Sequence, residues 1–399
     1  MENNIGLDFL GEVYALTAGE KHLGTFSITA RLREDVNVQI LRQAVADLAA
    51  RQPYISGYLT DDLRYKLLTQ PPQVIEDIGL PVFSAYYNEG DGHVLRVIYG
   101  ERHITVETAH FMTDGRGLSK IASALFVRYF ELLGVEIGDK GDIMDCNGTA
   151  LPEETEDAFA RYGGKEKPKP NKDKLKGKAY KHQHLQSCAT KVAARTFDLA
   201  KIKESAKASG VTVGGYVAAC IFSAIAKERD ASGNKQPIVM NIPVDFRSFL
   251  PSGTIRNFVG SKNIAMPEKA EFSAMAQQVQ QQFATINAEF AQAAADEFFV
   301  AKKALGRMPR WLKKFLLKTM NHFGFKKITT MLSNLGLVRL PKEVEQRIEN
   351  LEFVISPTDS TPYTFACTAV GNALTLSVTA DVDGDIAENV FAMLEENQG

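Results

Sequence analysis

The sequence predicts an α/β protein made of two similar lobes, and three observations lead to this fold class. The chain has 399 residues, which is more than one hydrophobic core usually supports. Each half combines helical patterns with several strand patterns. A lysine-rich stretch with few apolar residues separates the halves. We therefore expect an N-terminal lobe over residues 1–164, a crossover linker over 165–186 and a C-terminal lobe over 187–399.

Composition and charge are those of an ordinary soluble globular protein. Hydrophobic residues make up 45% of the chain, and the formal net charge of -2 gives no general attraction to nucleic acid. The first residues lack the basic and apolar blocks of a secretory signal. The widely spaced Cys146, Cys188, Cys220 and Cys367 favour free thiols in a reducing compartment over disulfides or a zinc site. We expect a cytoplasmic monomer that holds no metal.

Strand and helix patterns alternate through the N-terminal half. Apolar side chains recur at every second position of residues 24–32, which indicates a strand. The next segment has apolar residues at helical spacing. Two later strands are joined by a turn at Gly100 and Glu101, which predicts a hairpin. The predicted elements are a strand at 24–32, a helix closed by Pro53, strands at 65–68, 93–99 and 102–110, and a helix from Leu118 that ends at Gly134.

The C-terminal half shows the same alternation. Residues 237–243 (PIVMNIP) are apolar enough for a strand that lies between other elements. Residues 274–299 are rich in Ala and Gln and contain few helix breakers, which predicts one long helix. The other predicted elements are a strand at 190–198, a helix that ends at Gly210, a helix from Val213, strands around 352–355, 363–370 and 373–380, and a closing helix at 386–396.

One segment has some features of a membrane span. Residues 208–226 carry no charge over 19 residues. Ser, Thr, Tyr and three glycines dilute this stretch, and its apolar part from Val213 is short enough for a helix buried in a large domain. We therefore expect no transmembrane segment.

The sequence HFMTDG, which starts at His110, lies between a strand pattern and a helix pattern. Alternation along ITVETAH places His110 on the same face as Val106, at the last position of the strand. Partial desolvation there favours the uncharged imidazole, which a general base requires. Asp114 precedes Gly115, a residue that permits a turn, and can cap the new helix or pair with an arginine. The residues alone also fit a buried histidine followed by a helix cap and a turn.

Residues 307–327 contain seven basic residues, no acidic ones and the single tryptophan, Trp311. A structural helix would pack Trp311, Leu312, Phe315, Leu316 and Met320 inward and leave the lysines in solvent. A lid over a substrate channel and a peripheral contact with a membrane surface are the alternatives.

The order of strand, HxxxDG, helix, lysine-rich crossover and second lobe resembles the coenzyme A-dependent acyltransferase superfamily. Its members include chloramphenicol acetyltransferase, peptide-synthetase condensation domains and, nearest to this sequence, bacterial alcohol acetyltransferase-like proteins. The likeness covers nearly the whole chain. Four further stretches match in the family's order: VNVQILRQAVADLAARQPYISGYL, TFDLAKIKESAKASGVTVGGYVAACIFSAI, PVDFRSFLPSGTIRNFVG and SNLGLVRLP. The resemblance implies chloramphenicol acetyltransferase-like lobes with mixed sheets flanked by helices, and an active-site channel at their interface.

The resemblance also implies roles for individual residues. His110 would take the proton from an acceptor hydroxyl or amine as it attacks an acyl thioester. Asp114 would be structural and pair with an arginine, for which Arg247 is the first candidate, and Asp245 would brace the same region. A surface arginine after a strand is the equally simple interpretation of Arg247. Asn257 matches the family's "GN" position and could face the channel, although an asparagine in such a loop needs no function.

The thioester oxygen gains negative charge in the transition state, so a hydrogen-bond donor should lie near it. The sequence does not choose between Thr254, Asn257 and Tyr363 for this donor. The expected donor substrate is acyl-CoA, acetyl-CoA above all, with no metal. The expected acceptor is a small alcohol.

Departures from the family pattern narrow this interpretation. Condensation domains commonly carry a second histidine where this chain has Ala109, and the DFGWG motif is replaced by DFRSF at residues 245–249. No carrier-protein segment fits the length. These points favour a free-standing acyl-CoA enzyme. A condensation-type enzyme with a carrier-protein thioester or an amine acceptor, and a non-catalytic scaffold of the same fold, remain the alternatives.

Overall fold

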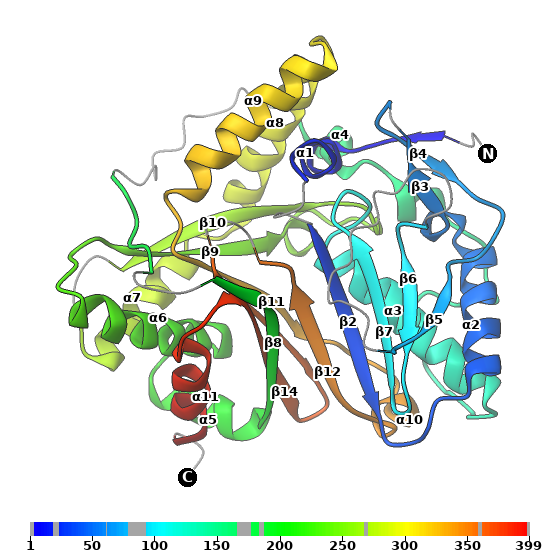
Figure 1. Cartoon of the computed structure of the whole chain (residues 1–399). Coiled ribbons are helices and arrows are strands. Elements are labelled where there is room, and N and C mark those ends of the chain that lie inside the picture. Colours follow the sequence, from blue (N-terminus) through cyan, green and yellow to red (C-terminus); the bar gives the residue numbers. More distant parts are fainter. Residues whose placement is uncertain are drawn as a thin grey trace.

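The computed structural model shows two α/β lobes side by side, with a sheet in each and helices on the outside (Figure 1). It describes residues 4–18, 24–60, 62–78, 93–165, 177–182, 187–266, 270–357 and 361–396. Both larger sheets mix parallel and antiparallel pairs, so the predicted α/β class with mixed sheets is confirmed.

The N-terminal lobe is built on a five-stranded sheet in the order β12-β2-β7-β6-β5. The strands β6 and β7 form the predicted hairpin, and β2 pairs with β7 so that Phe26 lies opposite Thr108. Its strands are β2 (Thr25–Leu32), β5 (Val74–Glu76), β6 (Arg96–Tyr99), β7 (His103–Ala109) and β12 (Ile348–Ile355), and a small separate sheet contains β1 (Asn4–Gly6), β3 (Gly57–Leu59) and β4 (Arg64–Leu67).

The C-terminal lobe is built on a six-stranded sheet in the order β10-β9-β11-β13-β14-β8. The apolar strand predicted at residues 237–243 is β9, and it does lie between two other strands. The strands are β8 (Ser187–Asp198), β9 (Ile238–Asp245), β10 (Val259–Met266), β11 (Thr330–Leu337), β13 (Tyr363–Val370) and β14 (Ala373–Val382).

Helices cover the sheets and complete two main cores, one in each lobe. In the N-terminal lobe α2 packs on α3, and in the C-terminal lobe α6 packs on α7 and α11. The helices are α1 (Phe9–Thr17), α2 (Val38–Arg51), α3 (Gly115–Leu132), α4 (Ala158–Tyr162), α5 (Leu199–Ala208), α6 (Val213–Ala231), α7 (Phe272–Phe283), α8 (Ala288–Gly306), α9 (Arg310–Phe325), α10 (Lys342–Glu345) and α11 (Ile386–Glu396), with 3₁₀ turns η1 (Pro53–Ile55), η2 (Pro152–Thr155) and η3 (Phe246–Ser248).

The uncharged stretch at 208–226 forms most of α6, whose apolar residues are buried in the C-terminal lobe. In the described part of the chain, no single helix has the length and hydropathy of a membrane span. Helices α5 and α6 pass such a test only as a pair, and a bend of 79° separates them.

Strand β12 comes from the second half of the chain but pairs along its length with β2 of the N-terminal sheet. The N-terminal lobe therefore contains a strand from the second half of the chain. The boundaries given for the two lobes stay a prediction. Of the predicted linker, the structure describes residue 165 and residues 177–182. In that part Tyr180 is fully buried in the C-terminal core rather than solvated.

One prediction about a helix was wrong, and one of the three interpretations of residues 307–327 does not hold. The helix expected at 274–299 is broken after Phe283, because the Asn287 side chain accepts a hydrogen bond from the Phe290 amide and starts α8 anew. In α9 three of the side chains that a purely structural helix would pack inward lie outward instead: Trp311 is 71%, Phe315 is 64% and Met320 is 68% exposed. The inner face of α9 is formed around Leu317, which packs on α1 and α8.

Candidate active site

His110 lies at the interface of the lobes, directly after β7. The strand ends at Ala109, one residue earlier than predicted, and the His110 amide donates to the Gly24 carbonyl oxygen. The Tyr14 ring of α1 stacks on the imidazole with centroids 3.9 Å apart and planes inclined by 15°. The Phe26 ring lies 4.9 Å away on β2. These contacts hold the ring in one orientation and leave it half-buried.

The side chain of Asn257 lies beside the imidazole. Its Oδ1 atom is 3.1 Å from His110 Nδ1, and its Nδ2 atom is 3.4 Å from Asp8 Oδ2. An ionised Asp8 accepts only, so it turns the Asn257 amide group toward itself and presents Oδ1 to the histidine. Nδ1 of His110 then carries the proton, and Nε2 is left with an acceptor lone pair.

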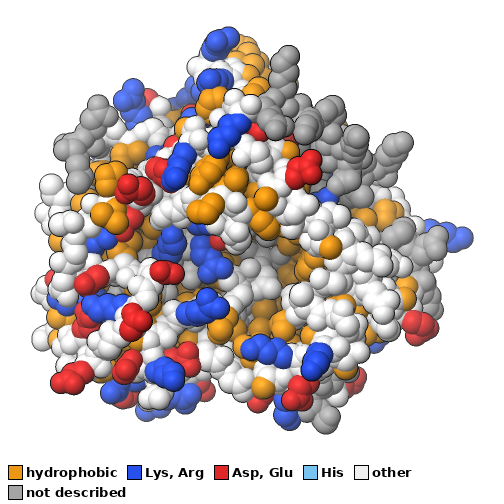
Figure 2. All heavy atoms as spheres, turned by 180° about the vertical axis from the view of Figure 1, so that it is seen from behind, with side chains coloured by type: hydrophobic (Ala, Val, Ile, Leu, Met, Phe, Trp, Pro, Cys, Tyr) orange, Lys and Arg blue, Asp and Glu red, His pale blue; other side chains and the backbone are white. Residues whose placement is uncertain are grey.

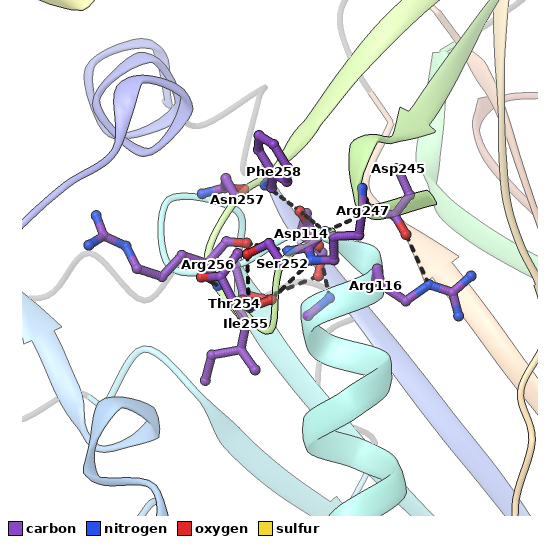
Figure 3. A network of polar contacts seen from close by, with 12 residues as sticks. Asp114, Arg116, Asp245, Arg247, Ser252, Thr254, Ile255, Arg256, Asn257 and Phe258 are labelled. Atoms are coloured by element: carbon purple, nitrogen blue, oxygen red, sulfur yellow. Dashed lines mark hydrogen bonds and ion pairs between the residues drawn. The ribbon is translucent and has the colours of Figure 1, made fainter. Parts of the chain in front are cut away.

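Asp114 joins the HxxxDG loop to the C-terminal lobe (Figure 3). Its Oδ1 atom caps α3 by accepting from the Gly117 amide at 2.8 Å. Its Oδ2 atom accepts from Arg247 Nη1 at 3.0 Å and from the Phe258 amide at 2.7 Å. The side chain of Asp114 is 2% exposed and that of Arg247 is 7% exposed, so this ion pair is buried. Arg247 is therefore not a surface arginine.

Arg247 is also tied to the chain around it. It pairs with Asp245 at 2.9 Å and donates to the carbonyl oxygens of Thr254 and Arg256 at 3.0 and 2.5 Å. Asp245 in turn contacts Arg116 at 3.3 Å (Figure 3). The loop that carries Asn257 is thereby fixed relative to α3.

Two glycines allow α3 to pack closely against its neighbours, Gly117 against this loop and Gly115 against β11 and β12. A side chain at Gly117 would collide with the Ile255 carbonyl oxygen, 2.1 Å from the position of an added Cβ. At Gly115 an added Cβ would lie 3.0 Å from Leu335 and 3.1 Å from Phe353. The turn interpretation of Gly115 was wrong, since its φ is not positive and close packing explains the glycine.

A cavity of about 410 Å³ opens beside His110 between the lobes, a size that suits a small ligand. Asn241, Ser261 and Ser333 are among its polar lining residues. The remaining lining comes from α1, α3, α8, α9 and five strands, and it includes Tyr14, Phe26, Asp114, Gly115, Arg116, Asp245, Met320, Asn321, Gly324, Asn334 and Leu335. Figure 2 shows a face with a central hollow that basic side chains border.

The cavity is not lined by Thr254 or Tyr363. The Thr254 hydroxyl is fully buried and donates to the Glu156 carbonyl oxygen at 2.8 Å. The Tyr363 ring lies in the C-terminal core, 5.1 Å from the His182 ring. Neither is in place to contact a thioester oxygen in this cavity. Asn257 likewise contacts His110 rather than the cavity.

Sequence reasoning missed two residues of the site. Tyr14 has no local signal that links it to a histidine far along the chain. Asp8 does have a local signal, because an aspartate at the start of DFLG fits a helix N-cap. In the structure Asp8 Oδ1 accepts a hydrogen bond from the Gly11 amide at 2.7 Å. That signal would have placed α1 but not its contact with Asn257. Among the described residues, no cluster of His, Cys, Asp and Glu suits a metal ion.

Burial raises the pKa of Asp8 to about 6, and the positive charge of Arg256 partly opposes this. The folded protein thus holds a proton on Asp8 between pH 3.8 and about 6 that the unfolded chain has lost, so stability falls as the pH rises through this interval. Asp8→Asn keeps a cap on Gly11 and removes the titration. In urea unfolding at several pH values, we expect the wild-type stability relative to this variant to fall by about 2 kcal/mol from pH 4 to pH 6. A constant difference would contradict the assignment.

The fold matches several solved structures, a condensation domain among them, over nearly its whole length. Polyketide synthase associated protein 5 from Mycobacterium tuberculosis superimposes with a TM-score of 0.65 and 16% identity, over 99% of this chain and 97% of that one. TRI101 of F. graminearum, solved with ethyl coenzyme A, gives 0.64 and 12%, over 98% and 97%. The first condensation domain of the CDA synthetase gives 0.60 and 12%, over 100% and 95%. A search of curated proteins returned no match.

The fold thus defines a two-lobed protein of the chloramphenicol acetyltransferase and condensation-domain class. The alcohol acetyltransferase family model matches residues 165–398, more than half of the chain. The protein belongs to the alcohol acetyltransferase family and is an acyltransferase. The resemblance found from sequence motifs is confirmed.

Proposed function

We propose that this protein transfers an acetyl or other short acyl group from acyl-CoA to an alcohol, with His110 as the general base. The observation that carries the proposal is the position of His110 on the inter-lobe cavity with Nδ1 held by Asn257. With Nδ1 donating to Asn257, Nε2 carries the lone pair that takes the proton from an acceptor hydroxyl.

The steps follow from this geometry. Nε2 takes the proton as the acceptor oxygen attacks the thioester carbonyl carbon, and a tetrahedral oxyanion forms. The carbon–sulfur bond then breaks, the imidazolium returns its proton to the leaving thiolate, and the ester and free CoA result. Polar groups that line the cavity, among them Asn241, Ser261 and Ser333, are the candidates for the oxyanion donor. The buried Asp114–Arg247 pair positions the loops.

The direct test is a free-thiol assay with acetyl-CoA against panels of alcohols and amines. We expect thiol release that depends on both the acyl-CoA and an alcohol. Release that requires an amine, or a carrier-protein thioester in place of acyl-CoA, would instead indicate condensation-type chemistry. Ala109, where condensation domains commonly carry a second histidine, favours the acyl-CoA enzyme. No release with any acceptor, together with a thermal shift on CoA binding, would indicate a non-catalytic scaffold.

Asn257 is proposed as a positioning residue that selects the His110 tautomer. Asn257→Leu removes the acceptor for Nδ1–H while keeping a similar volume, so both tautomers become populated. We expect kcat to fall about 10- to 100-fold with little change in KM, because the ground-state pocket is unaltered. Asn257→Asp keeps an acceptor oxygen for Nδ1–H, but it sets a second buried carboxyl against Asp8, so one of the two must be protonated and only part of the rate should be recovered. Equal rates for the wild type and Asn257→Leu would contradict this role.

A further inference from the structure

Helix α9 exposes a set of large apolar side chains that no other described part of the chain matches. Trp311 is 71%, Phe315 is 64%, Met320 is 68% and Phe323 is 60% exposed. The helix projects from the body of the protein beside α1 (Figure 1). Exposing such residues to water is unfavourable, so a partner for this face is expected.

Two of the exposed apolar residues, Trp311 and Phe315, share their face with lysines. Trp311 and Phe315 are one helical turn apart, and Lys314 and Lys318, which are also exposed, lie next to them around the helix. The whole segment 307–327 has seven basic residues and no acidic one, although the protein as a whole is slightly acidic. Basic and apolar side chains gather at the same projecting tip of the molecule in Figure 2. This combination of aromatic and basic residues is typical of a helix that lies in the interface of an anionic membrane.

The opposite side of α9 is fixed to the protein. Leu317 is buried against α1 and α8, and Lys313 pairs with Glu12 of α1 at 3.4 Å. Met320, Asn321 and Gly324 line the cavity that contains His110. One side of a single helix therefore forms part of the cavity wall, and another presents aromatic and basic side chains outward.

We propose that α9 binds the surface of a membrane that contains anionic lipids, and that the inter-lobe cavity takes an amphiphilic alcohol from that surface. The lysines would lie at the lipid headgroups, and Trp311 and Phe315 would enter the boundary of the acyl chains. The uptake of an alcohol acceptor from the membrane rests on the proposed acyl transfer. The binding of α9 to the membrane does not depend on it.

Membrane binding by α9 is tested with the full-length protein and phosphatidylcholine vesicles, with and without phosphatidylglycerol. Binding is measured by cosedimentation and by the emission of Trp311, the only tryptophan in the chain. We expect sedimentation with the anionic vesicles, a shift of the emission to shorter wavelength, and weaker binding at high salt. Neutral vesicles should bind markedly less.

Two variants and two matched controls locate the contact. Lys314→Gln combined with Lys318→Gln should weaken binding to the anionic vesicles about 20-fold or more, since each lysine contributes several-fold near such a surface. Phe315→Ser should weaken binding to a similar extent. Lys201→Gln with Lys203→Gln on α5, and Val300→Ser on α8, remove exposed side chains elsewhere and should leave binding unchanged.

Three results would overturn the membrane statement. They are no sedimentation with anionic vesicles, equal loss of binding in the α5 control, and an emission shift that appears with rising protein concentration alone. The last result would identify a second copy of the chain as the partner of α9.

The statement about the acceptor is tested by thiol release with acetyl-CoA. With a long-chain alcohol held in vesicles, the lysine variant should be slower than the wild type, whereas a short water-soluble alcohol should react equally well with both. Equal rates with the vesicle-held alcohol would overturn the statement. Vesicle binding without any thiol release would leave the membrane statement standing and remove the proposed acyl transfer.

Discussion

His110→Ala is expected to lower the rate of thiol release from acetyl-CoA about 100- to 10,000-fold while the protein stays folded. The variant removes Nε2, the only proposed proton acceptor at the reacting hydroxyl. The ring is half-buried beside a cavity, so its loss leaves space that solvent can enter rather than a sealed void in a core. The measurement is kcat/KM for acetyl-CoA at a saturating concentration of the alcohol, together with a thermal melt of each protein.

A histidine near the far end of the same strand provides the control. His103 also belongs to β7, and its ring pairs with Asp77 at 3.2 Å at the edge of the N-terminal lobe, away from the cavity. His103→Ala should therefore retain wild-type turnover. If His110→Ala kept its rate within about threefold of the wild type, the general-base role would be lost, because such a base contributes far more than this.

Arg247→Met is expected to destabilise the protein by about 3 to 5 kcal/mol, since it leaves Asp114 without its buried cation. It also removes donors to two carbonyl oxygens of the loop that carries Asn257. Activity should fall even below the melting transition, because the loop positions Asn257 beside His110. Urea unfolding measured by circular dichroism gives the free energy, and the thiol assay gives the rate.

A double-mutant cycle separates the ion pair from general damage. Asp114→Asn keeps the cap on Gly117 and removes the negative charge. If the two side chains are coupled, this substitution should lower the free energy of unfolding much less in the Arg247→Met variant than in the wild type. Additive effects would show that the two side chains are not coupled. Arg102→Met is the matched control, since the side chains of Arg102 and its partner Asp35 are more than 60% exposed and the variant should have no measurable effect.

Much of the secondary structure follows from the sequence because it depends on local spacing. The two-residue period of residues 24–32 and the helical stripe after Leu118 predicted β2 and α3 closely. The helix break at Asn287 was missed because a capping asparagine is only weakly distinguished from an ordinary helical one without knowledge of neighbouring turns. The exposed face of α9 stayed one of three alternatives for a different reason. Periodicity shows that a helix has an apolar side, but not whether the protein or a membrane covers it.

The sequence by itself determined the HxxxDG motif, the strand that ends beside it and the helix that Asp114 caps, because these features depend on residues a few positions apart. It also indicated the family through motifs in a fixed order. Only the tertiary structure decided which groups surround His110. Tyr14 and Asn257 reach it from two distant segments, and Asp8 contacts Asn257 in turn. Strand β12 crosses from one half of the chain to the sheet of the other. Such contacts depend on how whole lobes pack, and no local spacing in the sequence encodes that packing.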